Sequence, residues 1–147
     1  MNLSTRSRYA TRAMIQIAEY HGKSPVSLKI IEETQKISRN YLQQLMPPLK
    51  NEGLLRVAKG KSGGFMLARP PSEITIGDII RAQEGEIGLV ECVGEDGLCD
   101  FEGECPSREI WAEASRRLDA YFDSLTLEDV LKTWEQKRKR RRKGRKT

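Results

Sequence analysis

Residues 38–71 read SRNYLQQLMPPLKNEGLLRVAKGKSGGFMLARPP, a helical pattern that runs into two short apolar stretches around a glycine-rich centre. Ser38 suits an N-cap, because its hydroxyl can accept a hydrogen bond from an unpaired amide in the first turn of a helix. One face of this helix would be apolar, formed by Tyr41, Leu42, Leu45 and Leu49. Residues 54–58 and 65–68 then flank the turn KGKSGG, which is typical of a β-hairpin. The stretch therefore predicts an amphipathic helix followed by a hairpin with a positively charged tip.

Two prolines, Pro47 and Pro48, interrupt the helical pattern. An interior proline lacks the backbone donor and costs about 3 kcal/mol, and it disfavours helical backbone at the residue before it. We therefore expect the helix to kink or to end near Leu45, which leaves only its first two turns to contact a partner.

Two more helices are predicted before this stretch. The first covers about residues 4–20 and ends before Gly22. The second is short, residues 28–34, and should bury Ile30 and Ile31. A helix, a short helix, an amphipathic helix and a hairpin, in that order, form a winged helix-turn-helix arrangement.

Three helices are predicted after the hairpin. Thr75 and Asp78 form a capping-box pattern at the start of the first, and Thr126 and Asp129 form another at the start of the last. Between them, a long amphipathic helix follows Pro106.

Charge is strongly segregated along the 147 residues. Residues 1–72 carry 12 Lys and Arg against 4 acids, whereas residues 73–136 carry 5 against 17. Residues 137–147 carry 9 basic groups and no acid. The basic N-terminal half suits contact with a polyanion such as DNA, and the acidic half does not. The tail contains no apolar residue, and we expect it to be disordered.

The chain shows no apolar run near the roughly 20 residues that span a bilayer, and no signal-peptide core at its start. We therefore expect a cytoplasmic protein with no membrane partner. In that reducing compartment, clustered cysteines are more often metal-binding or catalytic than disulfide-bonded.

All three cysteines, Cys92, Cys99 and Cys105, fall in one acidic, glycine-rich loop with the spacing C-x6-C-x5-C. Three soft thiolates on a flexible loop suit a metal or an iron–sulfur cluster. Zinc is an alternative, since three thiolates and one oxygen form an acceptable tetrahedral site. A redox switch of bare thiols is a third reading; nearby carboxylates should disfavour it, because they raise the pKa of thiols.

The chain resembles the bacterial IscR/NsrR family of winged-helix repressors, whose members sense iron–sulfur status, nitric oxide or redox state. The motifs that carry the resemblance are LSTRSRYATRAM, SRNYLQQL, NEGLLRVAKGKSGGFMLAR, TIGDII, the three cysteines and LTLEDVL. The resemblance covers about residues 1–134. It implies a mainly α fold with a small β-hairpin wing, divided into a winged helix-turn-helix DNA-binding domain (1–72), a cysteine-containing sensor loop with dimerisation helices (73–134), and a basic disordered tail (135–147).

The resemblance also implies a homodimer that binds near-palindromic double-stranded DNA operators. Asn40, Gln43 and Gln44 match the base-reading positions, and both residue types can pair bidentately with adenine. The remaining DNA contacts would come from the helix start, the wing tip and the N-terminus: Ser38 and Arg39, then Lys59, Lys61 and Ser62, and finally Ser4, Arg6, Arg8 and Arg12. Contacts of the last group to phosphate would orient the protein without reading sequence.

The long helix, about residues 107–124, would form most of the dimer interface. Its apolar stripe consists of Ile110, Trp111, Ala114, Leu118, Tyr121 and Phe122. The alternative is that this stripe packs only within its own monomer.

The implied cofactor is an iron–sulfur cluster, 2Fe-2S or 4Fe-4S, held by the three cysteines. The fourth ligand is open, because Arg108 stands where some relatives have a histidine and Arg8 where others have an acid. The competing hypotheses are an iron–sulfur or zinc enzyme and an RNA-binding or architectural protein led by the basic tail. No histidine lies near the cysteines and no nucleotide-phosphate loop is present, so we expect a regulator rather than an enzyme.

Overall fold

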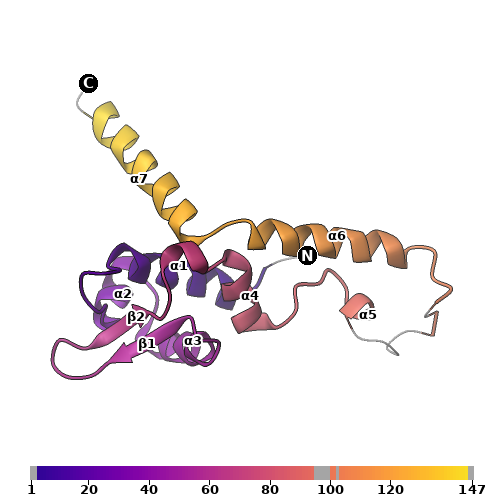
Figure 1. The fold of residues 1–147 in the computed structure, drawn as a ribbon, viewed down its shortest axis with the longest axis horizontal. Coiled ribbons are helices and arrows are strands. Elements are labelled where there is room, and N and C mark those ends of the chain that lie inside the picture. Colours follow the sequence, from indigo (N-terminus) through magenta and orange to yellow (C-terminus); the bar gives the residue numbers. More distant parts are fainter. Residues whose placement is uncertain (1–2, 95–99, 102, 146–147) are drawn as a thin grey trace.

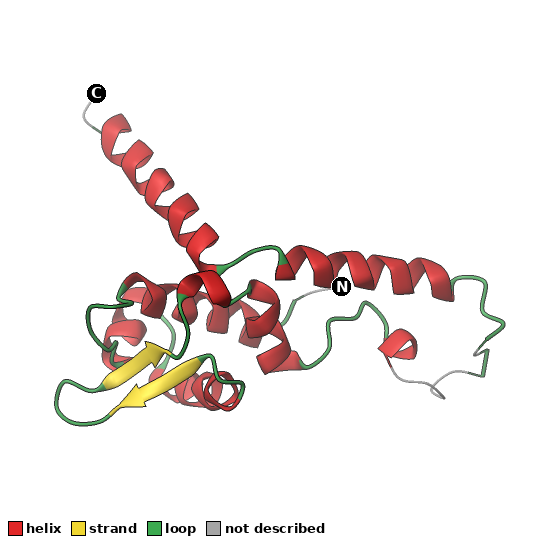
Figure 2. Ribbon diagram, in the orientation of Figure 1, coloured by secondary structure: helices red, strands yellow, loops and turns green. Residues whose placement is uncertain are grey.

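In the computed structural model, the described residues are 3–94, 100–101 and 103–145. Within them, the fold consists of seven α-helices, one short 3-10 helix and a two-stranded hairpin, which lies at one edge of the molecule (Figures 1 and 2). Their bounds are α1 Thr5–Glu19, α2 Leu28–Gln35, α3 Arg39–Asn51, β1 Leu55–Ala58, β2 Gly64–Leu67, η1 Pro71–Glu73, α4 Ile76–Glu84, α5 Glu91–Gly94, α6 Arg108–Asp123 and α7 Leu127–Gly144. The predicted fold class, mainly α with a small hairpin wing, is confirmed.

Side-chain caps begin most of the helices, and the cap predicted at Ser38 is one of them. Ser4, Ser27 and Ser38 each accept a hydrogen bond from an amide in the first turn of α1, α2 or α3, all at 3.3 Å. Both predicted capping boxes, at the starts of α4 and α7, are complete. Each cap satisfies backbone donors that a helix start otherwise leaves unpaired.

One hydrophobic core joins α1, α2, α3, the hairpin and α4. Met14, Ile31, Leu42 and Ile79 all have no exposed surface. The first residue of α7, Leu127, is also fully buried in this core. The core therefore extends on both sides of residue 72, where we predicted a domain boundary, and that boundary stays a prediction.

The predicted burial of Ile30 is wrong. Its side chain is 37% exposed, whereas Ile31 is fully buried. Adjacent residues lie about 100° apart on a helix, and a helix as short as α2 turns only one of them toward the core.

The wing is an antiparallel pair in which Leu55 faces Leu67 and Ala58 faces Gly64. Its second strand also pairs with Val26, through two backbone hydrogen bonds between Val26 and Phe65 of 2.8 and 2.9 Å. A Cβ at Gly64 would lie 2.5 Å from the Val26 carbonyl oxygen, so only glycine fits at this point.

The predicted end of α3 near Leu45 is wrong, because the helix continues through Pro47 and Pro48 to Asn51. The alternative, a kink at this point, stays a prediction. Leu45 and Met46 before the prolines and Leu49 after them are buried in the core. Burying three large side chains is worth several kcal/mol, which offsets the cost of the prolines.

The basic tail is helical in the structure and not disordered as we expected, since α7 continues to Gly144. The capping box at Thr126 and the packed residues Leu127, Val130 and Leu131 start this helix against the core. Lys and Arg have good helix propensity, so the helix can propagate beyond its packed base.

Two helices leave the core in different directions (Figure 1). α6 contacts α4 and α5, and Ser115 is its only buried residue. α7 contacts α1 and η1 and then projects away. None of the helices in the described part of the chain is long and apolar enough to cross a membrane.

Candidate DNA interface and cysteine segment

The first two turns of α3 present a polar face that is open to solvent. Asn40, Gln43 and Gln44 are exposed, while Leu42 and Leu45 on the opposite face are fully buried. The helix-turn-helix turn just before it places Lys36 in the left-handed region, with φ of 57°. The predicted base-reading side chains therefore lie together on one accessible face that the core holds in position.

Arg39, at the start of the same helix, is held by α2. Its guanidinium forms an ion pair with Glu32, with 3.0 Å between Nη2 and Oε2, and its backbone amide donates to Glu32 Oε1 at 3.2 Å. This contact crosses the helix-turn-helix turn. It fixes α3 relative to α2 and partly neutralises Arg39.

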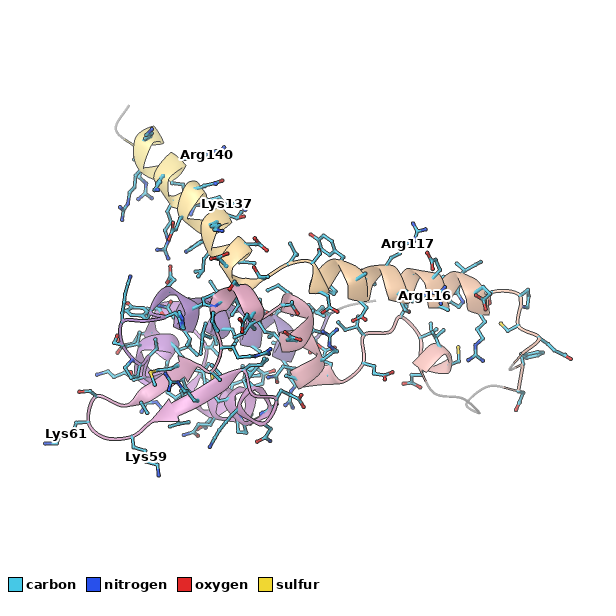
Figure 3. The ribbon with its side chains drawn as sticks, in the orientation of Figure 1. Lys59, Lys61, Arg116, Arg117, Lys137 and Arg140 are labelled. Atoms are coloured by element: carbon cyan, nitrogen blue, oxygen red, sulfur yellow. The ribbon has the colours of Figure 1, made fainter. Side chains whose placement is uncertain are left out.

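The wing carries its charges at the tip. Lys59 and Lys61 point outward from the end of the hairpin (Figure 3), and Ser62 beside them is exposed. Gly60 has a φ of +101°, and a Cβ at Gly63 would lie 2.4 Å from the Ala58 carbonyl oxygen. The tight turn that presents the two lysines thus depends on glycine at both positions.

The predicted phosphate-binding residues at the N-terminus differ in their surroundings. Arg6, Arg8 and Arg12 are exposed, and Ser4 is half-buried. Arg8 donates to Thr5 at 3.1 Å, and Arg12 donates to Gln35 at the end of α2. Arg12 thereby ties α1 to α2, so its role is structural as well as electrostatic.

Ser4 and Ser7 both donate hydroxyl hydrogen bonds to Glu84 at the end of α4. The Ser4 amide donates to the same carboxylate oxygen at 3.2 Å. Desolvation would raise the pKa of Glu84, but these hydrogen bonds and nearby Arg6 outweigh it and lower that pKa. Glu84 therefore connects the start of α1 to the segment that leads toward the cysteines.

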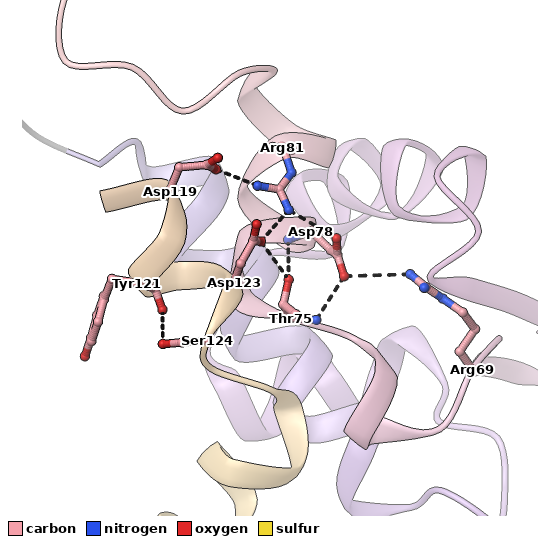
Figure 4. Close-up of polar contacts among 8 residues, drawn as sticks. All are labelled: Arg69, Thr75, Asp78, Arg81, Asp119, Tyr121, Asp123 and Ser124. Carbon is pink, nitrogen blue, oxygen red and sulfur yellow. Dashed lines mark hydrogen bonds and ion pairs between the residues drawn. The ribbon is translucent and has the colours of Figure 1, made fainter. Parts of the chain in front are cut away.

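Arg81 connects α4 to the long helix α6 (Figure 4). Its guanidinium lies 2.6 Å from Asp119 and 2.5 Å from Asp123, and 3.3 Å from Asp78 on its own helix. The hydrogen bond to Asp123 is the main reason why the pKa of Arg81 is raised. Neither Arg81 nor Glu84 was predicted as a site residue, although Arg81 stands out as the only basic residue between 73 and 107.

The cysteine segment lies between α4 and α6. Cys92 is on the short helix α5, and Cys105 lies just before α6; both are free thiols and half-buried. Cys99 lies outside the described residues. Among the residues that are described, no group of three or more His, Cys, Asp or Glu side chains is arranged to hold a metal ion.

Cys105 has an environment that the sequence analysis misjudged. Its sulfur lies 3.3 Å from the Ser107 hydroxyl. Hydrogen bonds from the Ser107 side chain and backbone, with smaller effects of Arg108, lower the pKa of this thiol. We expected the surrounding carboxylates to raise it. Thiolate character is what a metal ligand or a reactive cysteine requires, so Cys105 fits the donor chemistry of either site.

A hydrogen bond also joins this segment to α6. The Leu89 amide donates to Ser115 Oγ at 3.0 Å, and Ser115 donates to the Trp111 carbonyl at 2.8 Å. A groove of about 1170 Å³ runs between residues 84–93 and α6. Residues 84–93, which lead to the cysteine segment, are therefore hydrogen-bonded to α6 through Leu89 and also border an open groove along that helix.

The predicted dimer stripe is largely uncovered in the single chain. Ile110 is 59% exposed, Tyr121 58% and Trp111 42%. Ala114 and Leu118 are half-buried, and Phe122 packs against the chain's own core. Large apolar side chains gathered on one helix face and left in solvent are typical of an interaction surface.

Comparisons with known proteins agree with this arrangement. The profile of the Rrf2 family, described as iron-dependent transcriptional regulator, matches residues 3–133. The regulator CymR of Bacillus subtilis is 41% identical over 130 residues, which cover 88% of this chain and 89% of CymR. The regulator IscR of Serratia proteamaculans is 33% identical over 131 residues, which cover 89% of this chain and 79% of that protein.

Solved structures match as well. The structure of B. subtilis CymR, described as the global cysteine regulator, superposes with a TM-score of 0.76 at 38% identity and covers 90% of this chain and 98% of that one. T. potens IscR superposes with a TM-score of 0.77 at 34% identity and covers 92% and 90%. These relatives are transcriptional regulators and not enzymes. The chain belongs to the Rrf2 family of DNA-binding transcriptional regulators.

Proposed function

We propose that two copies of this chain form a homodimer that represses transcription from a near-palindromic operator. The observation that carries this proposal is the pairing of two surfaces on one chain. The exposed polar face of α3 lies beside a basic wing, and the exposed apolar face of α6 lies apart from both. A twofold axis through paired α6 helices would place the two α3 helices about 34 Å apart, in successive major grooves.

In this proposal α3 contacts the base edges of the DNA, and the wing contacts the DNA backbone. Asn40, Gln43 and Gln44 have amide groups that match the donor and acceptor pair of adenine. Lys59 and Lys61 approach phosphates beside the minor groove, and Arg6 and Arg8 contact phosphates from α1. Ser38 and Ser4 serve first as helix caps, so their contribution to DNA binding would be small.

The test is selection of bound duplexes from a random library, followed by affinity measurements on the selected site. Gln43→Ala should relax the preference at one base position and cost about 1–3 kcal/mol there. Lys61→Ala should weaken all sequences about equally and reduce the salt dependence. A library from which no palindromic site emerges would contradict the operator proposal.

We further propose that Cys92, Cys99 and Cys105 hold an iron–sulfur cluster. The half-buried free thiols of Cys92 and Cys105 support the donor chemistry, and so do the hydrogen bonds from Ser107 that lower the pKa of Cys105. A bound cluster would supply a centre that reacts with oxidants or nitric oxide. The fourth ligand would come from a nearby carboxylate, water or a small thiol.

The contacts on both sides of the cysteine segment support a role in transmitting a signal. It starts after Glu84, which is bonded to the start of α1, and it ends at α6, whose far end is bonded to Arg81. Binding of a cluster by these cysteines would therefore change how the DNA-binding part sits relative to the dimer helix. A ligand shifts such an equilibrium only by its unequal affinity for the two states.

Anaerobic purification with iron, sulfide and zinc assays tests the cluster. Visible charge-transfer bands with equal iron and sulfide would support it, and Cys92→Ser should abolish the colour. A colourless protein that contains zinc would favour a structural site. Operator affinity that is equal with and without the cluster, at fixed salt, would contradict sensing.

A thiol switch without a cluster is the second candidate. Two observations favour keeping it: the solved relatives include an oxidized form of Staphylococcus aureus CymR, 36% identical, and this chain has three thiols where a cluster commonly has four ligands. Metal-free protein whose operator affinity changes reversibly with a mild oxidant would support this candidate over the cluster.

A further inference from the structure

The end of α7 carries the densest charge on the molecule. Residues 137–145 read KRKRRRKGR, eight basic groups in nine positions, and every one of these residues is exposed. The family match ends at residue 133 and does not include them. This segment is therefore a feature of this chain that its family membership does not explain.

The base of α7 is fixed to the core, so the direction of the charged end is defined. Arg138 forms an ion pair with Glu19 of α1 at 2.5 Å, and its guanidinium lies 4.9 Å from the centre of the Trp134 ring. Leu127 is fully buried, and Val130 and Leu131 pack on the core. About ten further residues extend some 15 Å from Trp134 at 1.5 Å per residue.

This direction leads away from the candidate DNA interface. Lys137 and Arg140 lie on the opposite side of the molecule from Lys59 and Lys61 of the wing (Figure 3). α6 and α7 also diverge from their junction (Figure 1), so the basic end does not turn back along the acidic part of its own chain. A duplex seated on α3 and the wing would leave the end of α7 uncovered.

The charge pattern of residues 137–145 indicates that the partner of this segment is a polyanion. Like charges three and four residues apart destabilise a helix, and neutralisation by a polyanion removes this repulsion. The basic groups lie on all sides of the helix and leave no apolar face, which disfavours insertion into a membrane surface. Three consecutive arginines, Arg140–Arg142, can each form bidentate contacts to phosphate oxygens.

We propose that residues 137–145 of α7 form a second DNA-phosphate-binding element, which allows one dimer to hold two duplex segments. The first segment would occupy α3 and the wing, and the second would occupy the paired α7 ends. The inference rests on the DNA contact proposed for α3 and the wing. It adds a sequence-independent bridge between DNA segments to operator binding.

A capture experiment with the full chain tests this directly. A biotinylated 40-base-pair duplex of random sequence is immobilised and saturated with protein, and a fluorescent duplex of the same length is then added. The wild-type chain should retain the second duplex. A variant with Arg140→Gln, Arg141→Gln, Arg142→Gln and Lys143→Gln should retain the first duplex but lose capture of the second about tenfold or more.

The salt dependence gives an independent readout. The variant removes four phosphate contacts on each of the two paired α7 ends, and this should reduce the slope of log affinity against log salt for the second duplex by about 7. The matched control is Arg140→Lys, Arg141→Lys and Arg142→Lys, which keeps the charge and should keep most of the capture. Glutamine and lysine both favour helix, and circular dichroism checks that α7 is retained.

Other outcomes would overturn the inference. Unchanged second-duplex capture in the glutamine variant would show that α7 does not hold DNA. Tighter binding of the first duplex by that variant would indicate that the tail pairs with an acidic protein surface. Retention of an RNA hairpin in place of the duplex would assign the segment to RNA.

A variant of the other interface separates this inference from the proposed function. Asn40→Ala with Lys59→Ala and Lys61→Ala should still bind one duplex through α7, but it should not capture a second. If this variant captures as the wild type does, the first site is misassigned while the α7 site stands.

Discussion

Helices α1 and α6 are almost equal in length, with 15 and 16 residues, and both are amphipathic, yet they differ sharply in burial. Seven residues of α1 are buried, and only Ser115 is buried in α6. The apolar face of α1 packs within the chain, where α1 contacts α3, α4 and α7, whereas Ile110, Trp111 and Tyr121 on the apolar stripe of α6 are exposed. An apolar stripe in the sequence therefore does not tell whether a helix packs in the core of its own chain or forms an interface with a second chain.

A truncation in the buried helix should have the largest effect on stability. Ile17 is 1% exposed, and Ile17→Ala should lower the free energy of unfolding by about 2–5 kcal/mol through lost burial and a residual cavity. Urea unfolding measures this change. The matched variant Ile110→Ala, on the exposed face of α6, should cost the isolated monomer less than about 0.5 kcal/mol. Equal losses in the two variants at monomeric concentrations would contradict the comparison.

A charge placed on the α6 stripe should act on association instead. Trp111→Glu should raise the dissociation constant of the dimer about 30-fold or more, since a buried aromatic anchor at an interface is worth about 2 kcal/mol or more. Sedimentation over a concentration series measures this change. Glu109→Gln, exposed on another face of α6, is the control and should leave the dimer intact. A Trp111→Glu protein that dimerises normally would place the interface elsewhere.

Arg81 joins α4, which packs in the core, to the largely exposed helix α6. Removing Arg81 should have an intermediate effect on the free energy of unfolding. Arg81→Met would leave Asp78, Asp119 and Asp123 close together without their cation. With about a third of Arg81 exposed, screening limits the cost to about 1–2 kcal/mol. Thermal unfolding checks this value. Arg116→Met, which removes a surface pair with Glu113 on α6 alone, should cost about 0.5 kcal/mol or less.

Features that depend on neighbouring residues in the chain were predicted correctly from the sequence. The caps at Ser38, Thr75 and Thr126 and the turn between the wing strands depend on residues next to them in the chain, and all are confirmed. The wrong predictions concern features that depend on packing between distant parts of the chain. Burial of Leu49 by the core carries α3 past Pro47, and packing of Leu131 starts a helix that continues into the tail.

The candidate site follows the same division. The exposed amides of α3 and the lysines of the wing could be found from pattern, because their positions follow from local periodicity and a turn. Arg81 stands out in the sequence only as an isolated basic residue, and the partners of Arg81 and Glu84 could not be predicted, because they lie 38 to 80 residues away in the chain. The direction in which the pKa of Cys105 shifts was also predicted wrongly, since it depends mainly on hydrogen bonds from Ser107 and not on the average charge of the loop.

The smallest expected effect is a pH dependence at Glu84, which tests whether the start of α1 is tied to the cysteine segment. Its pKa in the folded state is lowered from the ordinary 4.5, so the unfolded state binds a proton more readily. The stabilisation is therefore fully present above about pH 4.5 and is lost as the pH falls through the lower, folded-state value. Glu84→Gln should lower the melting temperature slightly at pH 7, and the difference from the wild type should close as the pH falls from 5 toward 3.

Glu86→Gln, two residues away and exposed, is the control for a change of net charge and should show no such convergence. Ser7→Ala should reproduce part of the Glu84→Gln effect, because it removes one of the hydroxyl donors. A constant difference between wild type and Glu84→Gln from pH 7 to pH 3 would mean that the carboxylate contributes packing and not charge. In that case α1 would be joined to the cysteine segment through the core alone, and Glu84 would have no part in passing a signal between them.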